Sequence, residues 1–189
     1  MLTNVFISAD IIIYHMIQYC NTWRIARIFF DYPTTGFLLR ELSKISGLGL
    51  PSIKLHIRRL ENLGIVEKRE DKPYPRYYAT RNEVFKFYKL SDLILRIKES
   101  GLLDFLVDNF FPDAIVLFGS ASRGEDTEKS DIDLFLVAGR EEIELSGFEK
   151  ELKRKIELHF AKDVGKMPVE FLNSVINGIV LYGFLEVFE

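Results

Sequence analysis

The stretch FGSASRGEDTEKSDIDLFLV, residues 118–137, joins two apolar segments through a polar loop. The apolar run at its start predicts a short buried strand that leads directly into Gly119 and Ser120, and DIDLFLV predicts a second strand. Residues i and i+2 of a strand lie on one face, so Asp131 and Asp133 project together, about 6.6 Å apart along the chain. Two carboxylates directed at one point suit Mg²⁺, which prefers oxygen ligands. The stretch therefore predicts a strand, a loop and a second strand with a cation site at one end.

The loop after the first strand is suited to binding an anion. Gly119 lets the backbone approach a ligand closely, Ser120 adds a hydroxyl, and ASRGE predicts a helical turn whose free N–H groups face a phosphate. A polar strand end beside a turn, with no ligand, is the alternative interpretation of the same residues. The context of strand, turn and strand favours the phosphate site.

These residues resemble a known signature. Gly119 and Ser120, ten intervening residues and then the DID triplet are similar to the motif of the DNA polymerase β-like nucleotidyltransferase superfamily. GSASRGEDTEKSDIDL resembles the minimal nucleotidyltransferase branch of that superfamily, and the resemblance covers roughly residues 103–183. It implies transfer of NMP from an NTP, usually ATP, to an acceptor hydroxyl, with diphosphate leaving.

The resemblance also implies roles for individual residues. Mg²⁺ would be held by Asp131 and Asp133, where the metal offsets phosphate charge and orients in-line attack. Arg123 would neutralise a phosphate oxygen, and a solvated loop arginine is an equal alternative. The family often has a basic residue where this chain has Ala121, which predicts a weaker hold on phosphate. The nucleotide-binding residues that the resemblance implies are Gly119, Ser120, Arg123 and Ser130.

A third carboxylate is expected on a later strand. IELHFAKDV alternates, which places Glu157 and His159 on one face and apolar residues on the other. Glu157 stands where the family commonly has Asp; a third metal ligand and a solvated strand-face glutamate remain alternatives for it, since one extra methylene changes its reach. Asp163 is the weaker substitute, and His159 is interpreted as a strand-face residue and not as a ligand. The expected catalytic and metal-binding set is therefore Asp131, Asp133 and Glu157.

The two halves of the chain carry opposite charge. Residues 1–100 hold 16 Lys and Arg against 10 Asp and Glu, whereas residues 101–189 hold 9 against 18. A positive half indicates a polyanionic partner, and an acidic half argues against nucleic acid covering the whole surface. The single cysteine, Cys20, excludes an internal disulfide and a Cys-rich zinc site, and it fits a reducing cytoplasm.

The basic half predicts a nucleic-acid-binding module over residues 22–81. Helical periods at TWRIARIFFDYP, FLLRELSKISG and LPSIKLHIRRLENLG are followed by two alternating strands, IVEKRE and RYYATR, around a DKPYP turn. This order resembles a winged helix-turn-helix, whose third helix can enter the major groove of DNA. A solvated charged face and a protein-docking module are the alternatives. The expected DNA contacts are Ser52, Lys54, Arg58, Arg59 and Asn62, with Lys72 and Arg76 in the hairpin.

The resemblances imply an α+β fold in which a winged helix domain precedes a small nucleotidyltransferase domain with a mixed β-sheet flanked by helices. Residues 1–21 form an apolar segment whose uninterrupted runs are too short for a membrane span, so it is expected to pack on the body or on a second subunit. Residues 22–81 are the expected DNA-binding domain. Residues 82–102 predict a helical connector with Ser91 as an N-cap, and residues 103–189 the transferase domain.

Two functions fit this organisation. One is a Mg²⁺-dependent nucleotidyltransferase; relatives of this branch include antitoxins that modify a tyrosine on a partner toxin of the HEPN class, which would here be a separate protein. The other is a nucleotide-sensing regulator with a weak or vestigial transferase site, in which nucleotide binding to the acidic domain alters the basic one. Both predict a cytoplasmic protein without membrane contact. The apolar end of the chain indicates pairing with another subunit as a homodimer.

Overall fold

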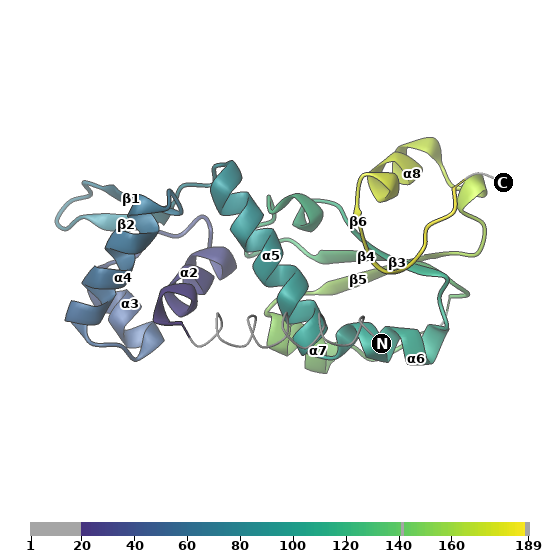
Figure 1. Cartoon of the computed structure of the whole chain (residues 1–189), viewed down its shortest axis with the longest axis horizontal. Helices are drawn as coiled ribbons and strands as arrows, with labels where there is room; N and C mark the ends of the chain where they lie inside the picture. Colours follow the sequence, from purple (N-terminus) through teal and green to yellow (C-terminus); the bar gives the residue numbers. More distant parts are fainter. Residues whose placement is uncertain (1–19, 141, 188–189) are drawn as a thin grey trace, which may run out of the picture. The chain divides into compact units, whose positions relative to one another are not determined.

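A computed structural model describes residues 20–140 and 142–187, and Figure 1 shows their helices and strands. The predictions for residues 1–19 lie outside the described residues. The chain divides into two compact units, with the boundary between Phe85 and Lys86. Helices and a mixed β-sheet are both present, which confirms the mixed α+β class.

The described part of the first unit contains helices followed by an antiparallel hairpin, the order predicted from the sequence. Gly47 has a φ of +71° and ends the second helix in the left-handed conformation that glycine adopts without strain. Pro51 lies in the first turn of the third helix. Backbone N–H groups there have no hydrogen-bond partner within the helix, so the missing N–H of proline costs no hydrogen bond. The elements are α2 (Asn21–Asp31), α3 (Leu39–Ser46), α4 (Leu50–Asn62), β1 (Val66–Arg69) and β2 (Arg76–Ala79).

The apolar stripe of α4 is buried, as its helical period predicts. Ile53, Ile57 and Leu60 are at most 2% exposed, and α4 packs against α2 and α3. His56 belongs to the same stripe, and its Nδ1 lies 2.8 Å from the hydroxyl of Thr22. Burial of the polar histidine is therefore accompanied by a hydrogen bond.

The buried His56 makes the first unit sensitive to acid. Burial lowers the pKa of His56, and the charge of Arg59 lowers it further. The unfolded chain, with the ordinary histidine pKa of 6.5, then binds the proton at a higher pH than the folded chain does. Stability therefore falls as the pH drops through 6.5, and the loss levels off below the folded pKa.

We expect this loss to be smaller in a His56→Gln variant. Trp23, the single tryptophan, lies in α2 and reports unfolding of the first unit by fluorescence. Melting the wild type and the variant at about pH 7.5 and about pH 5.5 measures the acid-induced drop in Tm of each. Equal drops in the two proteins would contradict the assignment of the effect to His56.

The second unit combines helices with a sheet. Helix α5 begins in the first unit and continues into the second. Gly101, with a φ of +74°, separates α5 from α6, as the sequence predicts. The elements are α5 (Glu83–Glu99), α6 (Leu102–Phe110), β3 (Ala114–Phe118), η1 (Ala121–Arg123), β4 (Ile132–Val137), α7 (Ser146–Leu152), β5 (Ile156–Ala161), η2 (Val164–Lys166), α8 (Val169–Ile176) and β6 (Ile179–Gly183).

The prediction that Ser91 caps a helix is wrong. Ser91 lies inside α5, and its hydroxyl donates to the carbonyl oxygen of Phe87 at 2.8 Å. A serine inside a helix satisfies its hydroxyl in this way on the preceding turn. The cap is instead Asn82, whose side-chain oxygen accepts a hydrogen bond from the backbone N–H of Phe85 at 2.9 Å.

The sheet of the second unit has the strand order β5-β4-β3-β6. β3 is antiparallel to both β4 and β6, whereas β4 and β5 are parallel and α7 lies on the crossover between them. The sheet is therefore mixed, as predicted. β4 lies at its centre with the Gly-Ser end of β3 on one side and β5 on the other.

The two faces of this sheet are covered by different helices (Figure 1). Leu117, Leu134 and Leu136 face one core, which also contains buried leucines from α6 and α7. Phe118 and Phe135 face the other core, which contains Val175 of α8. Both cores are apolar, so α8 and the α6–α7 side hold the sheet between them and fix the positions of the strand ends.

Candidate functional site

The strand register brings two of the predicted metal ligands together. Asp133 of β4 is the direct partner of Glu157 of β5, and neighbours in a parallel pair share a face. His159 follows two residues after Glu157 on the same face. Oxygen or nitrogen atoms of these three side chains all lie within 4.8 Å of one another. The cluster is therefore a direct consequence of the pairing of β4 with β5.

The sequence interpretation of His159 as an ordinary strand-face residue missed its place in this cluster. Its Nε2 lies 3.7 Å from Oδ1 of Asp133 and 3.8 Å from Oε1 of Glu157. The Nε2 atom is buried and has no hydrogen-bond partner among the described residues. The alternation of β5 could have indicated this role, because it already placed His159 beside Glu157.

Aromatic side chains fix the orientation of the His159 ring. The ring centroid lies 5.1 Å from that of Phe118 and 5.4 Å from that of Phe171, which α8 supplies. Phe118 and Phe171 also contact each other, with centroids 5.3 Å apart. The imidazole thus packs against a pair of aromatic rings, and Nε2 lies near the carboxylates.

Negative charge is crowded around Asp133. Burial raises the pKa of Asp133 above its ordinary value; the charges of Glu157 and Asp131 raise it further, while His159 opposes them. Asp131 precedes β4 and lies outside the cluster of Asp133, Glu157 and His159, although its charge acts on it. A bound cation would relieve this repulsion.

Gly119 closes the other side of the site. It has a φ of +71°, and a Cβ built on it would meet Oδ2 of Asp133 and lie 3.3 Å from Cγ of the same carboxyl. Glycine is required there for two independent reasons, the backbone conformation and the approach of the carboxylate. The Gly-Ser turn and the strand that carries Asp133 are therefore in contact.

The loop after Gly119 is held by its own hydrogen bonds. Ser120 accepts backbone N–H bonds from Arg123 and Glu125 at 3.2 and 3.0 Å through its carbonyl oxygen. Arg123 donates to the carbonyl oxygen of Gly119 at 2.9 Å and to Glu125 at 2.9 Å. The guanidinium therefore ties the loop together, and a phosphate would compete with these partners.

Three further positions named in the sequence analysis have clear local surroundings. The hydroxyl of Ser130 accepts a hydrogen bond from the backbone N–H of Thr127 at 2.9 Å, which shapes the turn before β4. Ala121 is fully buried in the core, so a long basic side chain at this position would have to leave it. Asp163, the weaker substitute for Glu157, instead pairs with Lys166 at 2.6 Å and lies outside the cluster.

The end of the loop is fastened to α5. Asp126 forms a buried ion pair with Lys89 at 2.6 Å. A Cβ on Gly124 would meet the backbone of Lys86, so this glycine allows the loop to pack directly on the helix. These contacts fix the polar loop on the side of α5, while its first residues reach the carboxylates.

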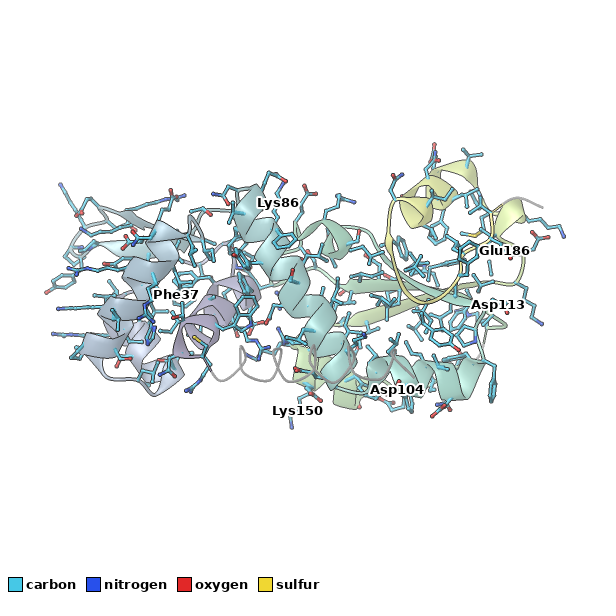
Figure 2. All side chains as sticks on the ribbon, viewed as in Figure 1. Phe37, Lys86, Asp104, Asp113, Lys150 and Glu186 are labelled. Atoms are coloured by element: carbon cyan, nitrogen blue, oxygen red, sulfur yellow. The ribbon has the colours of Figure 1, made fainter. Side chains whose placement is uncertain are left out.

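Two hollows lie near the site, one along β5 and one between the loop before β4 and α7. One, of about 390 Å³, runs along β5 from Glu157 to Ala161 and is bounded by Met167, Pro168, Phe171 and Arg140. The other, of about 510 Å³, begins at Ser130 and Asp131. Its remaining lining is rich in cations, among them Lys150, whose side chain projects outward from α7 in Figure 2. The cationic side chains around it are Lys129, Lys150, Lys153, Arg154 and Lys155.

Most of the predicted DNA-binding residues are exposed on the first unit, and Arg76 is held by contacts within it. Lys54, Arg58, Arg59 and Asn62 are exposed on α4, and Ser52 is half-buried. In the hairpin Lys72 is exposed. Arg76 instead donates to the carbonyl oxygen of Gly36 at 2.7 Å and lies 3.3 Å from Glu41, which holds it within the unit and competes with the predicted phosphate contact.

Comparison with known proteins finds one family match, and it lies within the second unit. Residues 101–183 match the family model described as Polymerase beta, Nucleotidyltransferase. The match supports a nucleotidyltransferase domain of the DNA polymerase β-like superfamily in this part of the chain. No curated protein and no solved structure matches the chain. Among the described residues, no helix combines the length and apolar character that crossing a membrane requires.

The donor atoms of the cluster fit a divalent cation. Asp133 and Glu157 present oxygen atoms to one half-buried point, and hard oxygen donors suit Mg²⁺ or Mn²⁺. The buried Nε2 of His159, without a hydrogen bond among the described residues, faces the same point. Asp133 and Glu157 are thus the residues that would hold the ion.

Proposed function

We propose that the second unit transfers NMP, with ATP as the expected donor, to a hydroxyl group in a reaction that depends on a divalent cation. The observation that carries this proposal is the convergence of Gly119, Asp133 and Glu157 from three adjacent strands. The match of residues 101–183 to the nucleotidyltransferase family supports the same chemistry. A chance polar strand end would not require a glycine to admit the carboxylate of the neighbouring strand.

The roles of the residues follow from their positions. Gly119 and Ser120 open the loop at the end of β3 and would receive the triphosphate, with Ser130 shaping the turn on the far side. Asp133 and Glu157 would hold the cation, and the nearby charge of Asp131 would add to its attraction. When bound, the cation would neutralise phosphate charge and polarise the α-phosphate. Glu157 lies across β4 from Gly119 and would act on the acceptor.

The transfer itself is a substitution at phosphorus. The acceptor oxygen forms a bond to the α-phosphorus while the bond from that phosphorus to the oxygen shared with the β-phosphate breaks, and diphosphate leaves with the electron pair. The hydroxyl proton passes to a base, for which Glu157 is the nearest carboxylate on the acceptor side. The acceptor would enter from the β5 side, where the hollow along Glu157–Ala161 lies.

Incubation with ATP labelled at the α-phosphate tests this proposal. We expect label on a hydroxyl of this chain or of a second protein, including a HEPN-class toxin as the resemblance implies, and we expect Asp131→Asn and Asp133→Asn to remove it. Binding of ATP without any transfer would instead support the nucleotide-sensing regulator. Neither binding nor transfer would overturn both functions.

We also propose that the first unit binds DNA through α4. Lys54, Arg58 and Arg59 are exposed on one face of this helix, while the opposite stripe is buried. Such a helix matches the width of the major groove, where arginine donates two hydrogen bonds to guanine. The net positive charge of residues 1–100 supports a polyanionic partner.

Removing Arg58 and Arg59 together should weaken DNA binding by at least about tenfold at low salt. It should also make the affinity less dependent on salt, because fewer counterions are released on binding. Fluorescence anisotropy with a labelled duplex over a series of salt concentrations measures both effects. The control is the double change Lys162→Ala and Lys166→Ala, which removes the same charge from the second unit. Equal losses in the two double variants would argue against a contact made by α4.

A further inference from the structure

We infer that His159 is a third protein ligand of the cation and that the site consequently prefers Mn²⁺ to Mg²⁺. This inference rests on the proposed function only in assuming that Asp133 and Glu157 hold a divalent ion. It assigns to His159 a role that the family resemblance does not supply.

The distances in the cluster suit ligands of one ion better than hydrogen bonds. Nε2 of His159 lies 3.7 Å from Asp133 and 3.8 Å from Glu157, beyond the range of a good hydrogen bond. Two ligand atoms that each lie about 2.1 Å from an ion are separated by about 3 to 4.2 Å, depending on the angle between them. The nitrogen therefore already stands at the separation expected of a coordinating atom.

The surroundings of the ring support the same assignment. A buried nitrogen without a hydrogen bond is costly, and Nε2 has none among the described residues. Phe118 and Phe171 contact the ring, so they fix its plane while leaving Nε2 directed at the two carboxylates. A ligand held in place by packing in this way loses little freedom when the ion binds.

The chemistry of the donor set decides the preferred ion. Mg²⁺ takes oxygen ligands almost exclusively and gives up water reluctantly. Imidazole nitrogen binds first-row transition ions more strongly, and Mn²⁺ also accepts carboxylate oxygen. A site with two carboxylates and one imidazole therefore discriminates against Mg²⁺, whereas an all-carboxylate site would not.

Metal binding to the nucleotide-free protein tests the inference without relying on catalysis. Isothermal titration calorimetry should show that Mn²⁺ binds at least about tenfold more tightly than Mg²⁺. In a His159→Phe variant, which keeps an aromatic ring against Phe118 and Phe171, Mn²⁺ affinity should fall by about tenfold or more while Mg²⁺ affinity changes little. The control His56→Gln, which removes a buried histidine of the first unit, should bind Mn²⁺ as the wild type does.

A spectroscopic readout makes the assignment direct. Pulsed electron paramagnetic resonance of the Mn²⁺-bound wild type should show coupling to a nitrogen nucleus, and the coupling should disappear in His159→Phe. Absence of nitrogen coupling in the wild type would overturn the inference, even if the protein transferred label from ATP in the presence of Mg²⁺. Conversely, histidine-dependent Mn²⁺ binding in a protein that transfers no label would uphold the inference and refute the proposed function.

Discussion

Asp133→Asn should lower the rate of nucleotidyl transfer by at least about a hundredfold, because changes to residues that merely support metal ligands already cost 10- to 100-fold. Asp133 lies next to Gly119 after β3, pairs across the strands with Glu157 of β5, and lies 3.7 Å from the ring nitrogen of His159. The amide keeps the shape of the side chain but loses its charge. The rate of label transfer from ATP at saturating metal measures the effect.

Loss of folding would not explain this result. The carboxylate of Asp133 is partly buried and repelled by Glu157 and Asp131, so replacing it with a neutral amide should leave the melting temperature of the metal-free protein unchanged or higher. Asp163→Asn is the matched control, since Asp163 lies outside the cluster and pairs with Lys166. That variant should retain at least about half of the wild-type rate. A comparable loss of transfer rate in both variants would show that Asp133 has no special role in the reaction.

The sequence predicted the parts of the site that depend on local pattern. The alternation of IDLFLV and IELHFA fixed which residues share a face, and the Gly-Ser pair marked the end of a strand. These patterns are short-range, and the strands formed with the expected faces. The position of Glu157 across from Asp133 also needed the register between β4 and β5, which no local pattern supplies.

The parts that the sequence did not predict depend on contacts between distant residues. The pairing of β4 with β5 brings His159 into the cluster, and Phe171 of α8 and Phe118 of β3 orient its ring. Ser91 was interpreted as a cap because serine favours helix starts, yet Asn82 caps the same helix nine residues earlier. In each case a residue had two acceptable local roles, and tertiary packing or a competing cap decided between them.

Gly119→Ala should reduce transfer by at least about tenfold, and its effect can be separated from simple backbone strain. An added Cβ meets the carboxylate of Asp133, so the side chain must leave its place between Gly119 and Glu157. The left-handed φ of +71° adds a cost of about 1–2 kcal/mol for any residue with a Cβ. The variant should therefore lose both stability and activity.

The variant Gly101→Ala separates the effect of backbone strain from the effect of displacing Asp133. Gly101 has a φ of +74°, nearly that of Gly119, but a Cβ on it would meet no atom within 4 Å. Its variant should melt lower because of the same backbone cost, yet transfer at close to the wild-type rate. Mn²⁺ affinity adds a second readout, since only Gly119→Ala displaces a metal ligand. If both alanine variants lost activity in proportion to stability, the contact between Gly119 and Asp133 would have no functional role, and the pairing of the Gly-Ser turn with the metal-binding strand would be a feature of folding alone.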